Sequence, residues 1–178
     1  MAKELEVKIL NIDLDDMEKK LKDIGGKLIA KEYQINTIFD SRDRYIEKDL
    51  NSYLRIRETK DLLKNNITIN LTLKKNISKE GARENIEITT KIDDKQSIIT
   101  ILQNLGYEKI EEGYKERISY TYDNIRFDLD KWDVNTYPYP YMEIEVEKKE
   151  DLEKAIDLLQ IDKSNISTKS IIELKEEL

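Results

Sequence analysis

Two segments far apart in the chain alternate strictly between charged and apolar residues. The first segment is Glu4-Leu5-Glu6-Val7-Lys8, and the second is Met142-Glu143-Ile144-Glu145-Val146-Glu147. Successive side chains of a β-strand point to opposite faces, so each segment predicts a strand with one charged and one apolar face. Like charges that crowd together are costly unless water or a cation screens them. If the two rows of carboxylates face each other, a divalent cation is the natural occupant of the space between them.

The same alternation recurs along most of the chain, and helical spacing of apolar residues separates some of the alternating stretches. Residues 42–50 are polar and predict a loop or a single helical turn. Strands are predicted at residues 3–11, 27–41, 52–59, 67–75, 83–90, 114–122, 125–132 and 141–148. Helices are predicted at residues 14–24, 93–105, 150–159 and 168–178.

This order of elements indicates an α+β protein that forms one domain over residues 1–178. A flat antiparallel sheet would place the charged strand faces in water. A closed barrel would instead gather the charged faces in one interior, with helices on its apolar outside. We favour the barrel because so many strands combine Arg, Lys, Asp and Glu on the same face.

The composition excludes several classes of site. The chain has no cysteine and no histidine, which rules out disulfides, thiolate metal sites, zincins and Ser-His-Asp hydrolases. Any metal must therefore bind oxygen ligands, which favours Mg²⁺, Mn²⁺ or Ca²⁺. The net charge of −7 argues against a nucleic-acid partner. Without a signal-peptide core or a long apolar run, we expect a cytoplasmic protein that does not enter a membrane.

The charged faces can be interpreted in two ways. Each row alone is explained by a solvated sheet face or by cross-strand ion pairs. Taken together in one interior, the rows suit a polyanion that binds through both cations and a metal, because Arg and Lys bind phosphate oxygens and carboxylates hold Mg²⁺. The acidic members of this set are Glu4, Glu6, Asp128, Asp130, Glu143 and Glu145. The basic members are Lys8, Arg55, Arg57, Lys74, Lys115, Arg117 and Arg126.

An ordered series of short motifs resembles the CYTH superfamily, the triphosphate tunnel metalloenzymes. Glu4-x-Glu6-x-Lys8 is similar to the ExExK signature of that family. Further matches follow in the family's order over nearly the whole chain. They are Leu54-Arg55-Ile56-Arg57, Leu73-Lys74, Arg83 with Glu87, Lys115-x-Arg117, Asp128-x-Asp130, Glu143-x-Glu145 and Lys169-Ser170.

The resemblance implies an eight-stranded antiparallel tunnel, a Mg²⁺ or Mn²⁺ cofactor and a small-molecule substrate that carries a triphosphate. It implies metal ligands at Glu4, Glu6, Glu143 and Glu145, joined by Asp128 or Asp130, between which the alternation does not choose. The implied phosphate contacts are Lys8, Arg55, Arg57, Lys74, Arg117 and Lys169. Arg83, Lys115 and Arg126 are further phosphate candidates, for which ordinary ion pairing with the carboxylates is the alternative.

The resemblance leaves the reaction open among several activities of the family. We favour hydrolysis of inorganic triphosphate, with adenylate cyclase, thiamine triphosphatase and a non-catalytic polyphosphate- or nucleotide-binding module as alternatives. The candidate catalytic residues are Lys8, Glu6 and Glu145. Trp132 and the tyrosines at 137, 139 and 141 could stack on a base or thiazole ring, or could simply pack against the barrel. Tripolyphosphate, ATP and thiamine triphosphate all remain candidate substrates, and a monomer and a homodimer are both compatible with the sequence.

Overall fold

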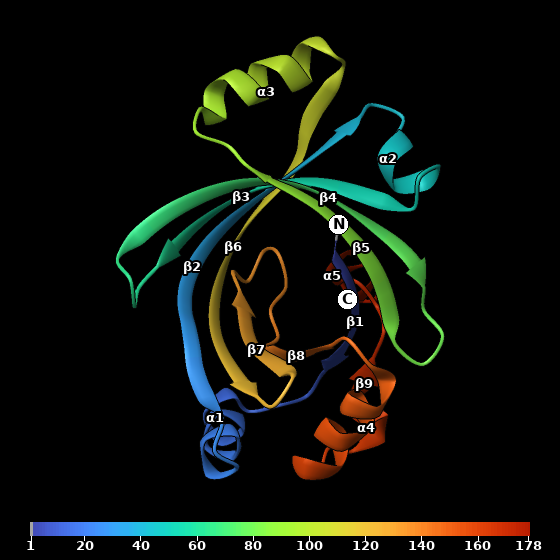
Figure 1. Ribbon diagram of the computed structural model, residues 1–178. Helices are drawn as coiled ribbons and strands as arrows, with labels where there is room; N and C mark the ends of the chain where they lie inside the picture. The colour runs from blue at the N-terminus through green and yellow to red at the C-terminus, as the bar shows by residue number, and fades with distance from the viewer. Residues whose placement is uncertain (1) are drawn as a thin grey trace.

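The computed structural model describes residues 2–178, and its centre is a closed antiparallel β-barrel (Figure 1). Strands β1 to β8 close because β1 pairs with both β8 and β5, and the short β9 adds to β1. The strands are β1 (Ala2–Ile9), β2 (Lys27–Ser41), β3 (Ser52–Asp61), β4 (Asn66–Ser78), β5 (Arg83–Lys91), β6 (Tyr107–Tyr122), β7 (Ile125–Trp132), β8 (Tyr141–Val146) and β9 (Ile166–Ser167). The predicted α+β fold with an eight-stranded barrel and helices outside it is therefore confirmed.

The helices are short and lie around this barrel, and their polar caps follow from the sequence. Asp13 and Asp94 are N-cap residues whose side chains accept backbone N–H groups of the first turn. Ser170 and Glu173 form a capping box at the last helix. The helices are α1 (Leu14–Asp23), α2 (Tyr45–Lys48), α3 (Lys95–Asn104), α4 (Lys149–Leu158) and α5 (Ile171–Lys175), with one 3₁₀ turn at Lys163–Asn165.

Most predicted elements differ from the observed ones by a few residues at their ends, and two differ most. Strand β6 begins at Tyr107, seven residues before the predicted start. Residues 108–112 are charged except for Ile110 and are followed by Gly113, which conceals the alternation there. The final helix was predicted from residue 168, but it begins after the Ser170 cap and ends at Lys175.

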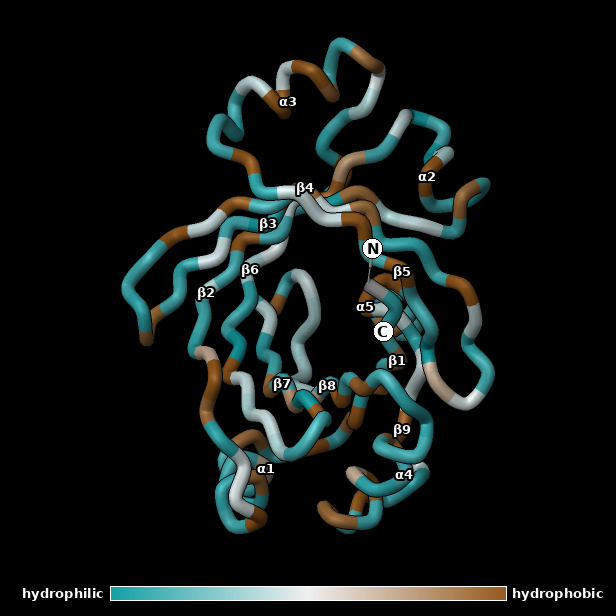
Figure 2. The backbone as a smooth tube through the Cα atoms, viewed as in Figure 1, coloured by the Kyte–Doolittle hydropathy of each residue, from teal (hydrophilic) through white to brown (hydrophobic). Residues whose placement is uncertain are grey.

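The apolar strand faces point outward and make the main core with two helices. Residues such as Val7, Phe127 and Ile144 are almost completely buried against Leu21 of α1 and Leu152 of α4. A second cluster packs α3 against the barrel, and a third joins α5 to the segment between β7 and β8. Figure 2 shows the resulting mixture of hydrophilic and hydrophobic positions along each strand. The barrel interior is left to the charged faces.

No helix in residues 2–178 is long and apolar enough to cross a membrane.

Candidate active site

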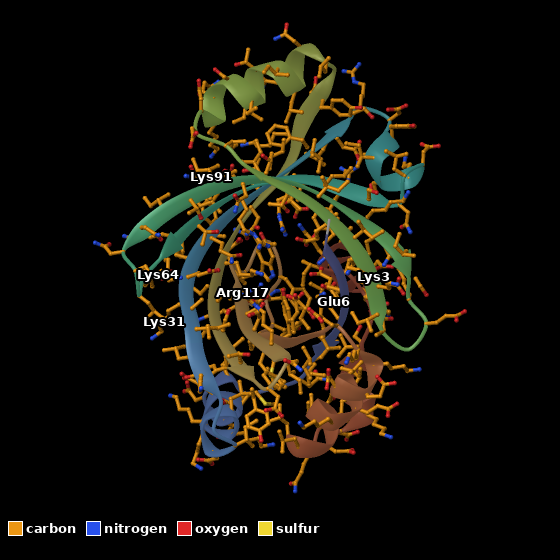
Figure 3. All side chains as sticks on the ribbon, in the orientation of Figure 1. Lys3, Glu6, Lys31, Lys64, Lys91 and Arg117 are labelled. Carbon is orange, nitrogen blue, oxygen red and sulfur yellow. The ribbon has the colours of Figure 1, made fainter. Side chains whose placement is uncertain are left out.

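The barrel encloses a cavity of about 520 Å³ that collects charged side chains from the eight strands β1 to β8. In Figure 3, Glu6 and Arg117 lie inside the barrel, whereas Lys31, Lys64 and Lys91 lie outside it. Twelve of the predicted site residues line this cavity. They are Glu4, Glu6, Lys8, Arg55, Arg57, Lys74, Arg83, Lys115, Arg117, Arg126, Glu143 and Glu145.

The strand register explains how residues so far apart in the sequence meet. In the β1–β8 pair, Lys8 lies opposite Glu143 and Glu6 lies opposite Glu145. In the β1–β5 pair, Glu6 lies opposite Arg83. Directly opposed residues of an antiparallel pair have their Cβ atoms about 4.5–5.5 Å apart. The two acidic rows of the sequence are therefore neighbours on the inner wall.

Three predicted residues do not line the cavity. Asp130 and Asp128 are only 0% and 1% exposed, because the basic side chains that pair with them cover them. Lys169 lies on the surface side, where its ammonium pairs with Glu177. The roles of these three residues as metal or phosphate contacts stay predictions.

On the β6–β7–β8 side of the wall, Arg117 is enclosed by carboxylates. Its guanidinium nitrogens lie 2.6 Å from oxygens of Asp128, Asp130 and Glu143. Burial lowers the pKa of Arg117, but these three neighbours outweigh burial and raise it well above its usual value. The charge of Arg117 is thus compensated by the protein itself.

Lys115 lies beside the same cluster but is harder to protonate. Its Nζ atom is 2.8 Å from Asp130 and 5.1 Å from the centre of the Trp132 ring. Burial and the charge of Arg117 nevertheless lower the pKa of Lys115 to about 7. Lys115 is therefore the inward lysine whose charge changes near neutral pH.

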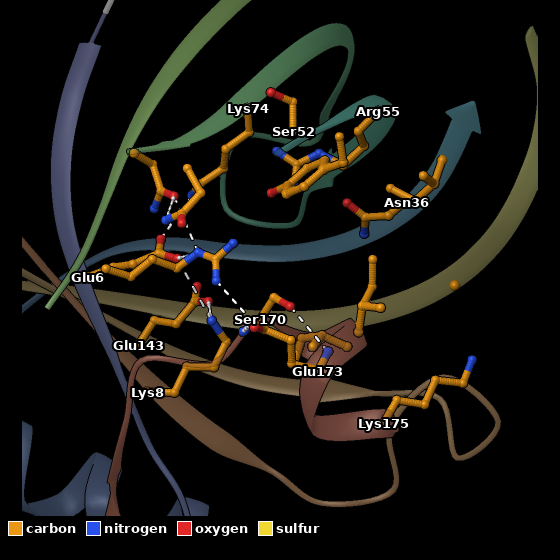
Figure 4. A pocket seen from close by; sticks show the side chains of 18 of the residues that line it. Glu6, Lys8, Asn36, Ser52, Arg55, Lys74, Glu143, Ser170, Glu173 and Lys175 are labelled. Carbon is orange, nitrogen blue, oxygen red and sulfur yellow. Dashed lines mark hydrogen bonds and ion pairs between the residues drawn. The ribbon is translucent and has the colours of Figure 1, made fainter. Parts of the chain in front are cut away.

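On the β1–β4–β5 side, Lys74 lies among three carboxylates. Its ammonium pairs with Glu4, lies 2.9 Å from Glu6 and lies 3.1 Å from Glu87 (Figure 4). Burial raises the pKa of Glu6, but Lys74 and Lys8 outweigh burial and bring it below its usual value. Glu87 matched the family motif in the sequence but received no role, and here it helps to hold Lys74.

Glu145 differs from the other inner carboxylates because no cation lies within 4.0 Å of it among residues 2–178. Burial raises its pKa to about 7, and the charges of Glu4 and Asp128 add to the effect. A crowded carboxylate without a partner is the kind of donor that a hard divalent cation stabilises. Within residues 2–178, no group of three acidic side chains is arranged as a ready metal site, so a cation there would have to displace existing ion pairs.

Strand β3 carries the two inner arginines that lack a carboxylate partner within 4.0 Å in the described chain. Arg57 donates from Nε to Asn36 Oδ1 at 2.8 Å, and Arg55 lies 5.5 Å over the Tyr53 ring. Burial and the positive charges of Arg55 and Arg117 lower the pKa of Arg57 to about 10. Arg57 is therefore a guanidinium that is still charged at neutral pH but is not neutralised by the protein.

Three of the four buried side-chain polar atoms that lack a hydrogen-bond partner in residues 2–178 belong to residues that line the cavity, and the fourth is Gln34 Oε1. The Nδ2 atoms of Asn36 and Asn85 and the Nε atom of Arg55 have no hydrogen-bond partner, and all three residues line the cavity. All three atoms are donors, and an unsatisfied buried donor is costly. The arrangement therefore provides positive charge and free N–H groups to an anionic oxygen. Sequence reasoning missed Asn36, although its inward position follows from the alternation Gln34-x-Asn36.

The sequence matches the CYTH domain family over residues 2–173, so this chain belongs to that family. The family, the fold and the charged interior agree with the resemblance that the short motifs indicated.

Among the similar proteins, one is named as an adenylate cyclase and another is described with a triphosphatase activity. The chain is 29% identical to "Putative adenylate cyclase MJ0240" of Methanocaldococcus jannaschii, over 97% of this chain and 98% of that protein. A solved structure from Pyrococcus horikoshii, that of the PH1819 protein, superposes with a TM-score of 0.79 at 23% identity over 98% of both chains. A protein from Hippeastrum superposes with a TM-score of 0.70 at 16% identity, over 99% of this chain and 96% of that one. That protein is described as a "Putative adenylyl cyclase" with a dominant triphosphatase activity.

Proposed function

We propose that the protein is a divalent-metal-dependent triphosphatase that hydrolyses inorganic triphosphate inside the barrel. The observation that carries this proposal is the pair of inner arginines, Arg55 and Arg57, for which residues 2–178 offer no carboxylate within 4.0 Å. A buried positive charge without a partner is unfavourable until an anion arrives. Phosphate oxygens satisfy a guanidinium with two parallel hydrogen bonds, which makes a phosphate chain the best match.

The inner carboxylates supply the second half of the proposed site. Their oxygen donors fit Mg²⁺ or Mn²⁺. A bound cation would also stabilise the charged form of Glu145, which the neighbouring Glu4 disfavours. Glu4, Glu6, Glu143 and Glu145 would hold the ion. When bound, such an ion neutralises the charge of a triphosphate and polarises the phosphoryl group that reacts.

The chain's own residues have separate tasks in this proposal. Arg55 and Arg57 bind the phosphate oxygens, and Lys8 and Lys74 complete the positive lining opposite them. Lys8 lies 3.0 Å from Glu143, and its pKa is raised because Glu143 and Glu6 outweigh burial, so Lys8 acts as a cation and not as a base. Lys115, with a pKa of about 7, is better placed to exchange a proton at neutral pH.

Adenylate cyclase is the second candidate because the relative from Methanocaldococcus jannaschii bears that name. A cyclase must also hold the adenine and ribose of ATP. Three aromatic residues line the cavity, and each already has a cation over one face of its ring: Arg55 over Tyr53, Lys8 over Tyr141 and Lys115 over Trp132. The indole N–H of Trp132 is also used, since it donates to the Tyr141 hydroxyl at 2.8 Å. These contacts leave little room for base stacking and favour the triphosphatase.

The test is to incubate the purified protein with Mg²⁺ or Mn²⁺ and, separately, with tripolyphosphate, ATP or thiamine triphosphate. Released phosphate, pyrophosphate and cyclic AMP are measured together. We expect phosphate from tripolyphosphate and no cyclic AMP from ATP. Cyclic AMP with equal amounts of pyrophosphate would replace the proposed function with the cyclase, and binding without any turnover would replace it with a polyphosphate-binding module.

A further inference from the structure

Two asparagines on the inner wall share an unusual arrangement. Asn36 is 3% exposed and lies directly opposite Arg57 in the β2–β3 pair, and Asn85 is 0% exposed on β5. The amide oxygen of Asn36 accepts from Arg57 Nε at 2.8 Å, and that of Asn85 accepts from Arg83 Nε at 3.3 Å. In both residues the Nδ2 group has no partner. Each asparagine thus uses its acceptor on an arginine and leaves its donor free.

The orientation of these amides is fixed by chemistry. A guanidinium only donates hydrogen bonds, so the side of the amide that faces it must be the oxygen. Turning either amide around would place an N–H group against the N–H of the arginine. The Asn85 oxygen also accepts from Asn76 Nδ2 at 3.3 Å, which supports the same orientation. The free side of each amide is therefore the donor.

At these positions a neutral amide can orient an arginine without neutralising its charge, whereas a carboxylate would do both. Arg117 shows the alternative, because its three acidic neighbours orient it and also neutralise it. Asn36 orients Arg57 through one hydrogen bond but leaves its full positive charge available. Figure 4 shows Asn36 and Arg55 on one side of the cavity and Glu6, Lys8 and Glu143 on another. The Asn36 side is the part of the wall that is short of acceptors, whereas Asn85 lies on β5, opposite Glu4 of β1.

We propose that Asn36 and Asn85 are anion-binding residues that orient Arg57 and Arg83 and donate their free N–H groups to phosphate oxygens. Asn36 does so without neutralising Arg57, whereas Arg83 shares its charge with Glu173 at 3.2 Å and Glu6 at 3.8 Å. This proposal rests on the proposed function, because it assigns the amides to the same polyphosphate. It adds two direct contacts that the charged motifs do not contain. It also explains why buried donors without partners are tolerated there: the bound anion supplies the missing acceptors.

The test compares the isosteric variants Asn36→Asp and Asn85→Asp with the wild type. Aspartate keeps the acceptor that faces the arginine, so the arginine stays oriented and the fold gains an ion pair. It removes the free donor and adds a negative charge that faces the anion. Isothermal titration with tripolyphosphate, with and without Mg²⁺, should show a Kd at least about 10-fold weaker in each variant, which corresponds to about 1.4 kcal/mol, because a charge-assisted contact is lost. The melting temperature should not fall.

Asn104→Asp is the matched control because it makes the same chemical change at an exposed position on α3. It should bind tripolyphosphate as the wild type does. If Asn36→Asp and Asn85→Asp also bind as the wild type does, the amide proposal is wrong, whatever the reaction is. If the wild type binds tripolyphosphate but does not hydrolyse it, the proposed function fails while weaker binding in the two variants still supports the amides. A wild type that binds no tripolyphosphate under either condition overturns both.

Discussion

The two sides of the barrel interior treat their arginines in opposite ways. On the β6–β7–β8 side, Arg117 lies 2.6 Å from three carboxylates, and its charge is fully compensated. On the β2–β3 side, Arg57 donates to the neutral amide of Asn36, and no carboxylate of residues 2–178 lies within 4.0 Å of it. Both side chains are inward-facing arginines on adjacent parts of one wall, and the sequence pattern does not distinguish them. The comparison shows that an inward cation without a carboxylate partner in the protein is the better candidate for binding an anionic ligand.

The largest expected effect comes from removing inner carboxylates, and it separates activity from stability. Glu6→Ala and Glu145→Ala should each lower metal-dependent kcat by about 10³-fold or more, because several kcal/mol of charge stabilisation by the metal is lost. Their melting temperatures should move in opposite directions. Glu6 compensates Lys74, so its loss destabilises the fold, whereas loss of Glu145 relieves its repulsion with Glu4.

These two variants are checked by phosphate release with Mg²⁺ and by thermal unfolding followed by circular dichroism. Wild-type kcat in both would eliminate the carboxylates as metal ligands. A fall in melting temperature for Glu145→Ala equal to that for Glu6→Ala would show that Glu145 has a cation partner in solution.

The second effect is smaller and concerns the two arginines directly. Arg57→Met should lower kcat/KM for tripolyphosphate by about 10- to 100-fold, mostly through KM, because the lost charge-assisted bonds hold the ground state as well. Its stability should change little, since the removed charge has no carboxylate partner. Arg117→Met should instead lower the free energy of unfolding by about 3–5 kcal/mol, because it leaves Asp128 and Asp130 buried without that partner.

Denaturant unfolding and steady-state kinetics on the two variants would measure this contrast. Equal losses of stability would mean that the compensation of Arg117 and the isolation of Arg57 do not describe the protein in solution. A KM unchanged in Arg57→Met would remove the unpaired arginine as the basis of the proposed function.

The smallest effect concerns Arg83, which is intermediate between the two cases. Besides Asn85, it lies 3.2 Å from the Glu173 carboxylate of α5. Burial raises the pKa of Glu173, but hydrogen bonds from Lys79 and from Ser170 outweigh burial and bring it to about 2. A carboxyl group whose pKa is lowered in the folded state stabilises the fold above its unfolded pKa, near 4.5, and loses this contribution as the pH falls toward 2.

Glu173→Gln should therefore melt at a slightly lower temperature than the wild type at pH 6. The difference between the two proteins should shrink steadily as the pH falls from about 4.5 to 2. A difference that stays constant over this range would show that the charge of Glu173 does not stabilise the folded state. The effect is small because Glu173 is partly exposed to water.

The sequence predicted the barrel, its helices and the inward set of charged residues because alternation is a local property. Glu6 and Lys8 share one face, opposite Leu5 and Val7, as soon as their segment is a strand. Partners depend on register and on strand order, which local patterns do not specify. For that reason the sequence could not choose between Asp128 and Asp130 as a metal ligand, and it did not show that Asp130 pairs with Lys115 and Arg117. Asn36 was missed for a related reason, since an amide in a strand carries no charge signal.

The closure of the barrel also has a consequence for how the chain folds. Strand β1 pairs with β8, so that Leu5 lies opposite Val146, and it pairs with β5, so that Lys3 lies opposite Ile86. Contacts this distant in sequence give a high contact order, which slows folding because long loops must close before the contact is gained. Until that happens β1 has two open edges and an exposed apolar face. The carboxylates of Glu4 and Glu6 lie on its other face. Their charge disfavours association between incompletely folded molecules, because charge on an unpaired strand disfavours pairing with other molecules.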